Sequence, residues 1–156
     1  MLAREIMDTR FFPLHPEDTI GAAVQTFHRA GKALGKKVFG LMVTDLGDRL
    51  AGMLSMYDIL LYMQPRHIQI WGEMPDMDIQ ARFEATLEGV KNVRVGDLMT
   101  TEVVTIGPET HLLMISDIMI KKHIRRLPVI EKDRVLGIVY ISDVFSHLLR
   151  RFWESP

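Results

Sequence analysis

The chain has no cysteine among its 156 residues, so neither a disulfide nor a thiolate centre can belong to it. Proteins without disulfides are typical of reducing compartments, and we expect a cytoplasmic location. No apolar run approaches the roughly 20 residues that a membrane-spanning helix needs. Arg4 and Glu5 interrupt the stretch where a signal peptide would need an apolar block. We therefore expect a soluble protein without a membrane partner.

The chain also lacks an excess of charge of either sign. Lys and Arg number 19 and Asp and Glu number 20, which gives a net charge of −1. Such a balance creates no overall field to recruit nucleic acid or anionic lipid, so neither is an expected partner. The length suits one domain or two small halves that pack together, and it is sufficient to bury a core.

Patterns typical of catalytic or metal sites are missing as well. No two of the six histidines stand at the spacing of a helical metal-ligand pair, and no serine has the glycine neighbours of a nucleophile. The segment from Gly31 to Lys37 resembles a phosphate-binding loop only weakly, because it is one residue short and lacks the Ser or Thr that binds magnesium. We predict that the protein is not an enzyme and that it holds no metal.

What the chain does contain is an internal repeat. The first two matches lie 92 residues apart, and the later two lie 86 and 85 residues apart, so the first copy is longer by six residues before its middle strand. The extra residues fall in a loop rich in glycine and lysine. The matched segments are 3–7 with 95–99, 16–17 with 108–109, 41–45 with 127–131, and 52–58 with 137–143.

The clearest part of the second copy is residues 125–143. Two runs rich in β-branched residues, 127–130 and 135–141, are separated by a polar stretch, which predicts two strands joined by a tight turn. Pro128 cannot donate to a ladder, so we expect it at the start or edge of its strand. Helical spacing of apolar residues begins after Ile141, and Ser142 and Asp143 are the expected caps of that helix.

Each copy predicts the same order of elements, β-α-β-β-α. A short helical turn ends at Met7 or Met99, and a strand follows over 11–14 or 103–106. The next helix is expected to be capped by Asp18 or Thr110. One such unit leaves apolar surface exposed, so we expect the two α/β copies to form a pseudo-twofold pair, packed sheet to sheet as one module.

This pattern resembles the tandem CBS-domain pair, or Bateman module, over residues 1–63 and 94–153. The resemblance is carried by the two Met turns, Pro-Glu before each first helix, Arg126-Leu-Pro-Val129, and a Gly-x5-Asp motif after each third strand. It implies a first repeat at 1–63, a connector at 64–93 and a second repeat at 94–156. It also implies that an adenine nucleotide lies in a cleft between the repeats, with the motif's carboxylate on the ribose hydroxyls and no obligatory cofactor.

In the first copy the motif keeps Gly52, Ser55 and Asp58. An ionised aspartate can accept hydrogen bonds from both ribose hydroxyls, and Ser55 is placed to hold ribose or phosphate. Gly52 lets its strand approach a neighbour closely. The alternative is that Ser55 and Asp58 only cap the following helix. Thr100 and Thr101 either contact a base or ribose or simply begin a strand.

The second copy keeps Asp143 but carries Tyr140 where Ser or Thr is usual. Tyr140 either stacks on a base or fills and blocks the site. Arg125 and Arg126 suit a phosphate because guanidinium donates two bonds at once. The matching positions in the first copy, Phe39 and Gly40, are uncharged, with lysines on the nearby inserted loop as substitutes. We predict unequal sites, with the Asp58 site the better one.

Two regions outside the motifs suggest contacts with other chains. Residues 64–77 form an irregular connector and 78–92 a helix, for which we predict a role at a cleft mouth or dimer face with Trp71 as anchor. The C-terminal helix is unusually apolar, which predicts a homodimer. Its apolar residues are Phe145, Leu148, Leu149, Phe152 and Trp153.

These observations together predict a regulatory module. The expected ligand is AMP, ADP, ATP or an S-adenosylmethionine-like molecule, and its binding would change the orientation of the repeats. The effector would be a separate chain, because these residues contain no attached enzyme or transporter domain. The alternative is a structural dimerisation module with vestigial or empty pockets, which Tyr140 and the uncharged Phe39-Gly40 pair favour.

Overall fold

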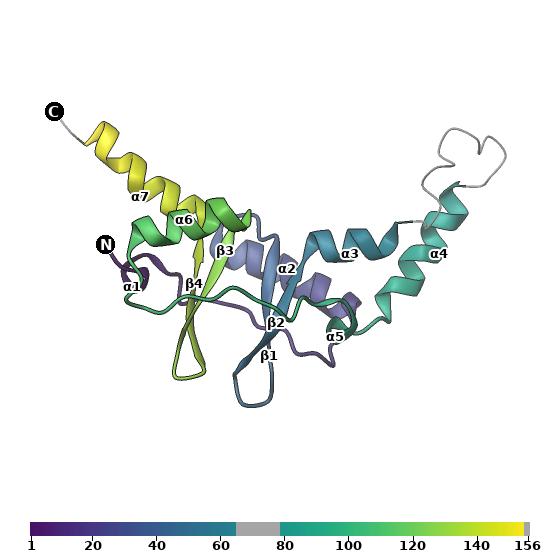
Figure 1. Ribbon diagram of the computed structural model, residues 1–156. Helices are drawn as coiled ribbons and strands as arrows, with labels where there is room; N and C mark the ends of the chain where they lie inside the picture. Colours follow the sequence, from purple (N-terminus) through teal and green to yellow (C-terminus); the bar gives the residue numbers. More distant parts are fainter. Residues whose placement is uncertain (65–78, 155–156) are drawn as a thin grey trace. The chain divides into compact units, whose positions relative to one another are not determined.

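A computed structural model describes residues 1–64 and 79–154, and it shows a mixed α/β protein in which a helix, a two-stranded hairpin and a second helix follow one another twice (Figure 1). The connector around Trp71 lies outside the described residues, whereas the predicted helix over 78–92 is present. Across the described residues, no helix is both long and apolar enough to cross a bilayer. The elements are α1 (Ala3–Ile6), α2 (Ile20–Leu34), β1 (Gly40–Thr44), β2 (Leu50–Ser55), α3 (Met56–Met63), α4 (Ile79–Lys91), α5 (Val95–Leu98), α6 (Leu112–Lys122), β3 (Arg126–Glu131), β4 (Arg134–Tyr140) and α7 (Ile141–Trp153).

The chain divides into two compact units that do not coincide with the two sequence repeats. One unit comprises residues 12–45 and 51–101 and is called here the Asp58 unit; the other comprises 1–11, 46–50 and 102–156 and is called the Asp143 unit. Each repeat therefore gives its leading helical turn to the other unit, α1 to the Asp143 unit and α5 to the Asp58 unit. The repeat boundaries at 63 and 94, and the stacking of the two sheets, stay predictions.

The sheet of the Asp143 unit contains the predicted hairpin. Strands β3 and β4 pair antiparallel, from Arg126 opposite Tyr140 to Glu131 opposite Arg134. The turn residues Lys132 and Asp133 have φ values of 49° and 64°, the left-handed conformation that tight hairpin turns require. The carbonyl of Pro128 accepts from Ile106 N at 3.0 Å, on the edge of β3 away from β4. The missing donor of Pro128 therefore leaves the hairpin ladder intact, as expected for an edge position.

Single bridges flank each hairpin on both sides. In the Asp143 unit, Ile106 pairs parallel with Val129 and Asp8 pairs antiparallel with Ile138. The Asp58 unit repeats the arrangement, with Leu14 beside Val43 of β1 and Thr100 beside Met53 of β2. The strands predicted over 11–14 and 103–106 are thus reduced to single bridges. Prolines explain this, because Pro13 and Pro16 surround the first bridge and Pro108 follows the second, and proline cannot continue a ladder.

Each repeat contributes the segment that begins with its leading helical turn to the other unit, and these two are called here the exchanged segments. Two glycines allow the exchanged segments to cross the sheets closely. A Cβ at Gly52 would lie 2.6 Å from the carbonyl oxygen of Thr100, and one at Gly137 would lie 2.8 Å from that of Asp8. Neither distance is compatible with a side chain unless the backbone moves. The expectation that Gly52 permits a close approach is confirmed, and Gly137 serves the same purpose in the other unit.

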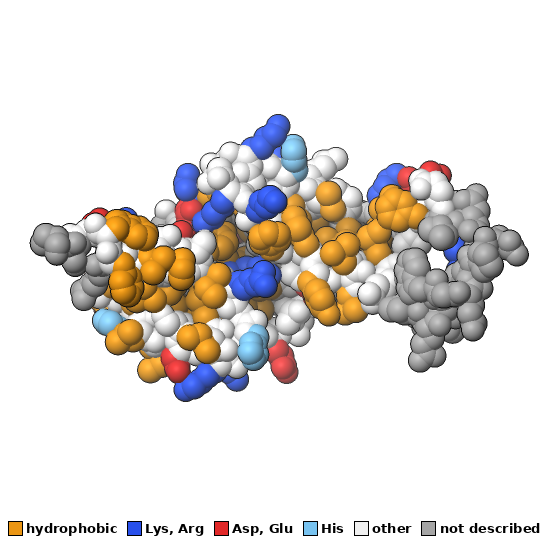
Figure 2. Space-filling model, turned by 90° about the horizontal axis from the view of Figure 1, so that it is seen from above, with side chains coloured by type: hydrophobic (Ala, Val, Ile, Leu, Met, Phe, Trp, Pro, Cys, Tyr) orange, Lys and Arg blue, Asp and Glu red, His pale blue; other side chains and the backbone are white. Residues whose placement is uncertain are grey.

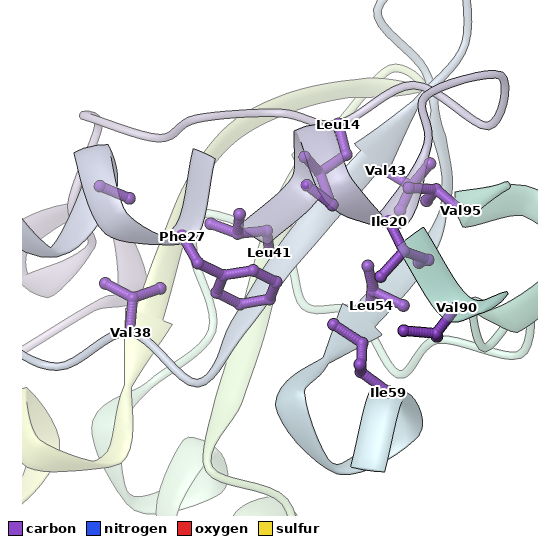
Figure 3. Packing of buried hydrophobic residues seen from close by; sticks show 12 residues of the cluster. Leu14, Ile20, Phe27, Val38, Leu41, Val43, Leu54, Ile59, Val90 and Val95 are labelled. Atoms are coloured by element: carbon purple, nitrogen blue, oxygen red, sulfur yellow. The ribbon is translucent and has the colours of Figure 1, made fainter. Parts of the chain in front are cut away.

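Each unit has its own hydrophobic core. In the Asp58 unit, Phe27 of α2, Leu41 of β1 and Leu54 of β2 pack with Val90 of α4 and Val95 of α5 (Figure 3). The core of the Asp143 unit contains Leu127, Val129 and Val139, and it also buries Ala3 and Ile6 of α1. The exchanged segments are therefore part of the cores and do not lie loosely on the surface.

The helix caps differ from those predicted. Helix α2 is capped by Thr19, whose Oγ1 accepts from Ala22 N at 3.2 Å, and α6 by His111, whose Nδ1 accepts from Leu113 N at 3.2 Å. The predicted caps Asp18 and Thr110 were wrong by one residue. The Asp18 carboxylate instead accepts from His15 N at 2.8 Å, which closes the turn before the helix.

The cap predicted for the last helix was also wrong. Tyr140 is the N-cap of α7 and makes no side-chain cap hydrogen bond. Ser142 and Asp143 lie within the first helical turn. The reason is that β4 continues directly into α7, so no polar residue separates the strand from the helix.

Candidate functional site

The candidate site lies at the same junction in each unit, where the second hairpin strand continues into a helix. Ser55 ends β2 and is the N-cap of α3, and Tyr140 ends β4 and is the N-cap of α7. Met56 N donates to Phe39 O at 2.8 Å, and Ile141 N donates to Arg125 O at the same distance. These matching contacts make Phe39 equivalent to Arg125, Gly40 to Arg126 and Ser55 to Tyr140.

The candidate side chains lie on the sheet face opposite the core of their own unit. Leu54 and Val139 are fully buried in the two cores. Because successive side chains of a strand point to opposite faces, Ser55 and Tyr140 belong to the other face. Asp58 and Asp143 follow in the first turn of the helix, and both are half-buried.

In the Asp58 unit, Ser55 and Asp58 form a reciprocal capping box. Asp58 Oδ2 accepts from Ser55 N at 2.8 Å and from Ser55 Oγ at 2.8 Å, while Asp58 N donates to Ser55 Oγ at 3.1 Å. The capping interpretation of this pair is therefore confirmed. These bonds use one carboxylate oxygen, Oδ2, and fix the direction of the side chain. A ligand role for both residues stays a prediction.

Thr100 and Thr101 belong to the same unit as Ser55 and Asp58, although they come from the other repeat. Met53 N donates to Thr100 O at 2.9 Å, and Thr100 N donates to Met53 O at 2.8 Å. The bridge holds the threonine segment against β2, two residues before Ser55. Both threonines are exposed. Four of the predicted site residues are thus assembled in one unit.

Phe39 is a candidate that the sequence analysis treated only as a missing charge. Phe39 is 48% exposed, and it directly precedes Gly40 at the start of β1. Its carbonyl accepts the first amide of α3, so it stands at the same end of the sheet as Ser55. Exposed aromatic rings are common stacking surfaces for bases. The sequence signal that could have identified Phe39 is that the first repeat has an aromatic residue at the position that corresponds to Arg125.

The Asp143 unit brings together the other four predicted residues. Arg126 lies directly opposite Tyr140 in the hairpin register, so both side chains lie on one face. Arg125 precedes it and accepts the first amide of α7 through its carbonyl. Asp143 lies in the first turn of α7, and its carbonyl is 2.8 Å from Nδ1 of His147.

Asp8 and Arg10 also belong to this cluster, and the sequence analysis missed both. Asp8 N donates to Ile138 O at 2.8 Å and Ile138 N to Asp8 O at 3.0 Å, which places Asp8 where Thr100 lies in the other unit. The Asp8 side chain is only 14% exposed, and it pairs with Arg10, with Nη2 3.1 Å from Oδ2 and Nε 3.2 Å from Oδ1. The offset of 92 between the repeats matches Asp8 with Thr100 and was the signal that could have identified it.

Tyr140 experiences the charges of this cluster. Burial, followed by the carboxylate of Asp8, raises the pKa of Tyr140 to about 12; Asp143 adds in the same direction and Arg126 opposes. The phenol is therefore neutral over the whole physiological range. Asp8, Arg126, Tyr140 and Asp143 each have an interaction partner within the chain. In contrast to the Ser55–Asp58 pair, this site contains three arginines, Arg10, Arg125 and Arg126, and a bulky ring.

Comparison with known sequences identifies relatives of the chain. The family model described as CBS domain matches residues 3–65 and 95–150. An uncharacterised 33.4 kDa protein of Thermofilum pendens is 39% identical over 115 residues, which are 74% of this chain and 34% of that protein. The chain spans about a third of the length of the first curated relatives that it matches.

Solved structures show the same fold. CBSX2 in complex with AMP has a TM-score of 0.70 at 21% identity, and the match covers 97% of this chain and 98% of that one. The CBS domain pair of MJ0100 in complex with 5′-methylthioadenosine and S-adenosyl-L-methionine has a TM-score of 0.69 at 18% identity, with the same coverage.

Proposed function

Since the chain belongs to the CBS domain family, we propose that it is a regulatory module that binds an adenosine-containing ligand and transmits binding to a separate protein. The observation that carries this proposal is the assembly of Ser55, Asp58, Thr100 and Thr101 in one unit. Relatives of the same fold solved with AMP and with S-adenosyl-L-methionine support the class of ligand. We propose a sensor and not a catalyst.

Asp58 is the proposed ribose-binding residue. Its Oδ2 is fixed by Ser55, which orients the carboxylate without using Oδ1 in the capping box. A carboxylate accepts charge-assisted hydrogen bonds from vicinal hydroxyls, each worth about 1.5–3 kcal/mol. The capping role and the ligand role are therefore compatible, because one oxygen serves the helix and the other is proposed to serve the ligand.

The remaining contacts are assigned by chemistry. The exposed hydroxyls of Thr100 and Thr101 can bond polar edges of a base or ribose, and the ring of Phe39 offers a stacking surface. In the Asp143 unit, Arg125, Arg126 and Asp143 occupy the positions that correspond to Phe39, Gly40 and Asp58.

The proposed signal uses the exchange of segments. A ligand that holds Asp58 and Thr100 together ties a segment of the second repeat to β2 of the first. Binding favours whichever arrangement of the repeats keeps these groups in place. A partner protein that prefers that arrangement would bind with altered affinity, by an amount equal to the coupling free energy.

The proposal is tested by thermal unfolding with AMP, ADP, ATP, adenosine and S-adenosylmethionine. A ligand present at a hundredfold excess over its Kd adds about 2.7 kcal/mol of stability. For a chain of this length that is a rise in Tm of roughly 5–10 °C. Asp58→Asn should abolish the rise, while Asp97→Asn, an exposed carboxylate in α5, should retain it. If no ligand raises Tm, the proposed function is wrong; if Asp58→Asn responds like the unmodified chain, only the assignment of Asp58 to the ribose is wrong.

We also propose that the module is a homodimer that uses α7. Ile141, Phe145, Leu148 and Phe152 are 42%, 60%, 38% and 80% exposed, and their 4-3-4 spacing is that of a coiled-coil seam. Figure 2 shows hydrophobic side chains gathered over this helix, at the left of the view. This surface equally suits a structural dimerisation module with empty pockets, which the same ligand screen separates from a sensor.

Light scattering tests the dimer. Phe152→Glu should give the mass of one chain at micromolar concentration, whereas Ser146→Glu, an exposed position of the same helix outside the stripe, should leave a dimer. A monomeric unmodified chain would contradict the dimer proposal.

A further inference from the structure

We propose that the Asp143 unit carries an internally closed counterpart of the Asp58 site, with Tyr140 and Arg126 as the closing residues, so that each chain binds one ligand and not two. The inference rests on the proposed ligand-binding function and assigns its stoichiometry. The two strand-to-helix junctions are structurally equivalent.

Three equivalent positions carry small side chains in one unit and larger or charged ones in the other. Gly40 of the Asp58 unit corresponds to Arg126, as the hydrogen bonds of Phe39 and Arg125 to the two helix starts show. Ser55 corresponds to Tyr140, because both are the last strand residue and the N-cap of the next helix. The Asp143 unit therefore carries a guanidinium and a phenol at the positions where the Asp58 unit carries glycine and serine.

The two N-cap side chains also lie differently. Ser55 Oγ is folded back onto its helix, where it accepts from Asp58 N at 3.1 Å and donates to Asp58 Oδ2 at 2.8 Å. Tyr140 makes no such cap, and a phenol is too long to do so. It lies opposite Arg126 in the register, half-buried, on the face where the Asp58 unit presents Ser55.

At the third equivalent position, the Asp58 unit has the neutral hydroxyl of Thr100 and the Asp143 unit has the ion pair of Asp8 with Arg10. Asp8 occupies the place of Thr100 and is held by Arg10 through both carboxylate oxygens. The Asp8 charge and the Asp143 charge both act on the Tyr140 phenol. A ribose that approached Asp143 would have to replace these interactions, whereas one that approaches Asp58 meets an oriented carboxylate beside exposed threonine hydroxyls.

The same cluster disfavours a phosphate. Arg10 is committed to Asp8, and Arg126 has a partner within the chain. A phosphate bound there would also lie near the carboxylates of Asp8 and Asp143, and like charges repel. The presence of arginines, which predicted a phosphate site from sequence, is offset by the carboxylates that accompany them.

The test is the number of ligands bound per chain at saturation, measured by native mass spectrometry and calorimetry. The probe is whichever of AMP, ATP and S-adenosylmethionine raises Tm most. We expect one bound ligand for the unmodified chain, one for Tyr140→Phe, none for Asp58→Asn, and two for the double variant Arg126→Gly with Tyr140→Ser.

Two ligands on the unmodified chain, or a ligand retained by Asp58→Asn, would overturn the inference while leaving the proposed function intact. A folded double variant that binds only one ligand would overturn the assignment of Tyr140 and Arg126. If the double variant does not fold, the counts for the unmodified chain and Asp58→Asn still decide. Binding of no probe by the unmodified chain would instead refute the proposed function, and the inference with it.

Discussion

Replacing Gly52 by alanine tests the crossing of the exchanged segment over β2. The added Cβ would lie 2.6 Å from the backbone oxygen of Thr100 and 2.9 Å from Sδ of Met99. Ordinary C···O contacts begin at about 3.3 Å, so the overlap with the oxygen is roughly 0.7 Å. The methionine side chain can move. The oxygen cannot move freely, because the backbone of Thr100 makes two hydrogen bonds to the backbone of Met53, one through its N–H and one through its carbonyl.

The expected loss of stability follows from these contacts. Overpacking of this kind costs about 1–3 kcal/mol. If the strand and the Thr100 segment separate to relieve it, the two hydrogen bonds between Met53 and Thr100 weaken, and each is worth about 0.5–1.5 kcal/mol. A total of at least about 2 kcal/mol lowers Tm by roughly 4–8 °C in a chain of this length.

Differential scanning calorimetry and urea titration measure this loss. The matched control is Gly89→Ala in α4, where an added Cβ meets nothing within 4 Å. Alanine inside a helix is favoured over glycine by about 0.5–1 kcal/mol, so the control should raise Tm slightly. A Gly52→Ala chain that unfolds at the unmodified temperature would refute the close crossing, and with it the proposed position of Thr100 beside the ligand.

Three further predictions concern stability. Ile6→Ala should lower the free energy of unfolding by about 2–5 kcal/mol, because Ile6 is 5% exposed in the core of the Asp143 unit. Arg4→Ala on the same turn should lower it by under about 1 kcal/mol. Equal Tm values for the two variants would contradict the exchange of α1. Ser55→Ala should cost about 0.5–2 kcal/mol through loss of the α3 cap, measured by urea titration. Since Tyr140 has a raised pKa, the unfolded chain releases its proton from about pH 10 and the folded chain only near pH 12, so stability should fall over that window. Tyr140→Phe should lack this part of the fall, and identical pH profiles would count against the buried phenol.

The local elements were accessible from sequence because each depends on neighbouring residues. The hairpin of β3 and β4 was predicted from two β-branched runs around a polar turn, and the helical turns ending at Met7 and Met99 from their repeated motif. Helix starts were less accurate, because Asp18 and Thr19 are both good caps and only the turn at His15 determines which one is used.

The exchange of segments could not be predicted, because a repeat shows that two segments are alike but not which sheet each one joins. For that reason Asp8 was missed, although its equivalent Thr100 was identified. The grouping of Arg125, Arg126, Tyr140 and Asp143 was predicted from the family motif. Their opposing charges became apparent only when Asp8 was placed beside Ile138.

The position of α1 has a consequence for synthesis of the chain on the ribosome. Ala3 N donates to Thr110 O at 2.8 Å and Arg4 N to Pro108 O at 3.0 Å, so α1 is bonded to residues that are translated much later than α1 itself. At about 5–20 residues per second, α1 must remain unpaired for roughly 5–20 s after its own synthesis. The nascent Asp58 unit faces no such delay at its own start, but it must wait for α5. Helix α1 therefore cannot reach its native place until the later segments of the Asp143 unit have been made.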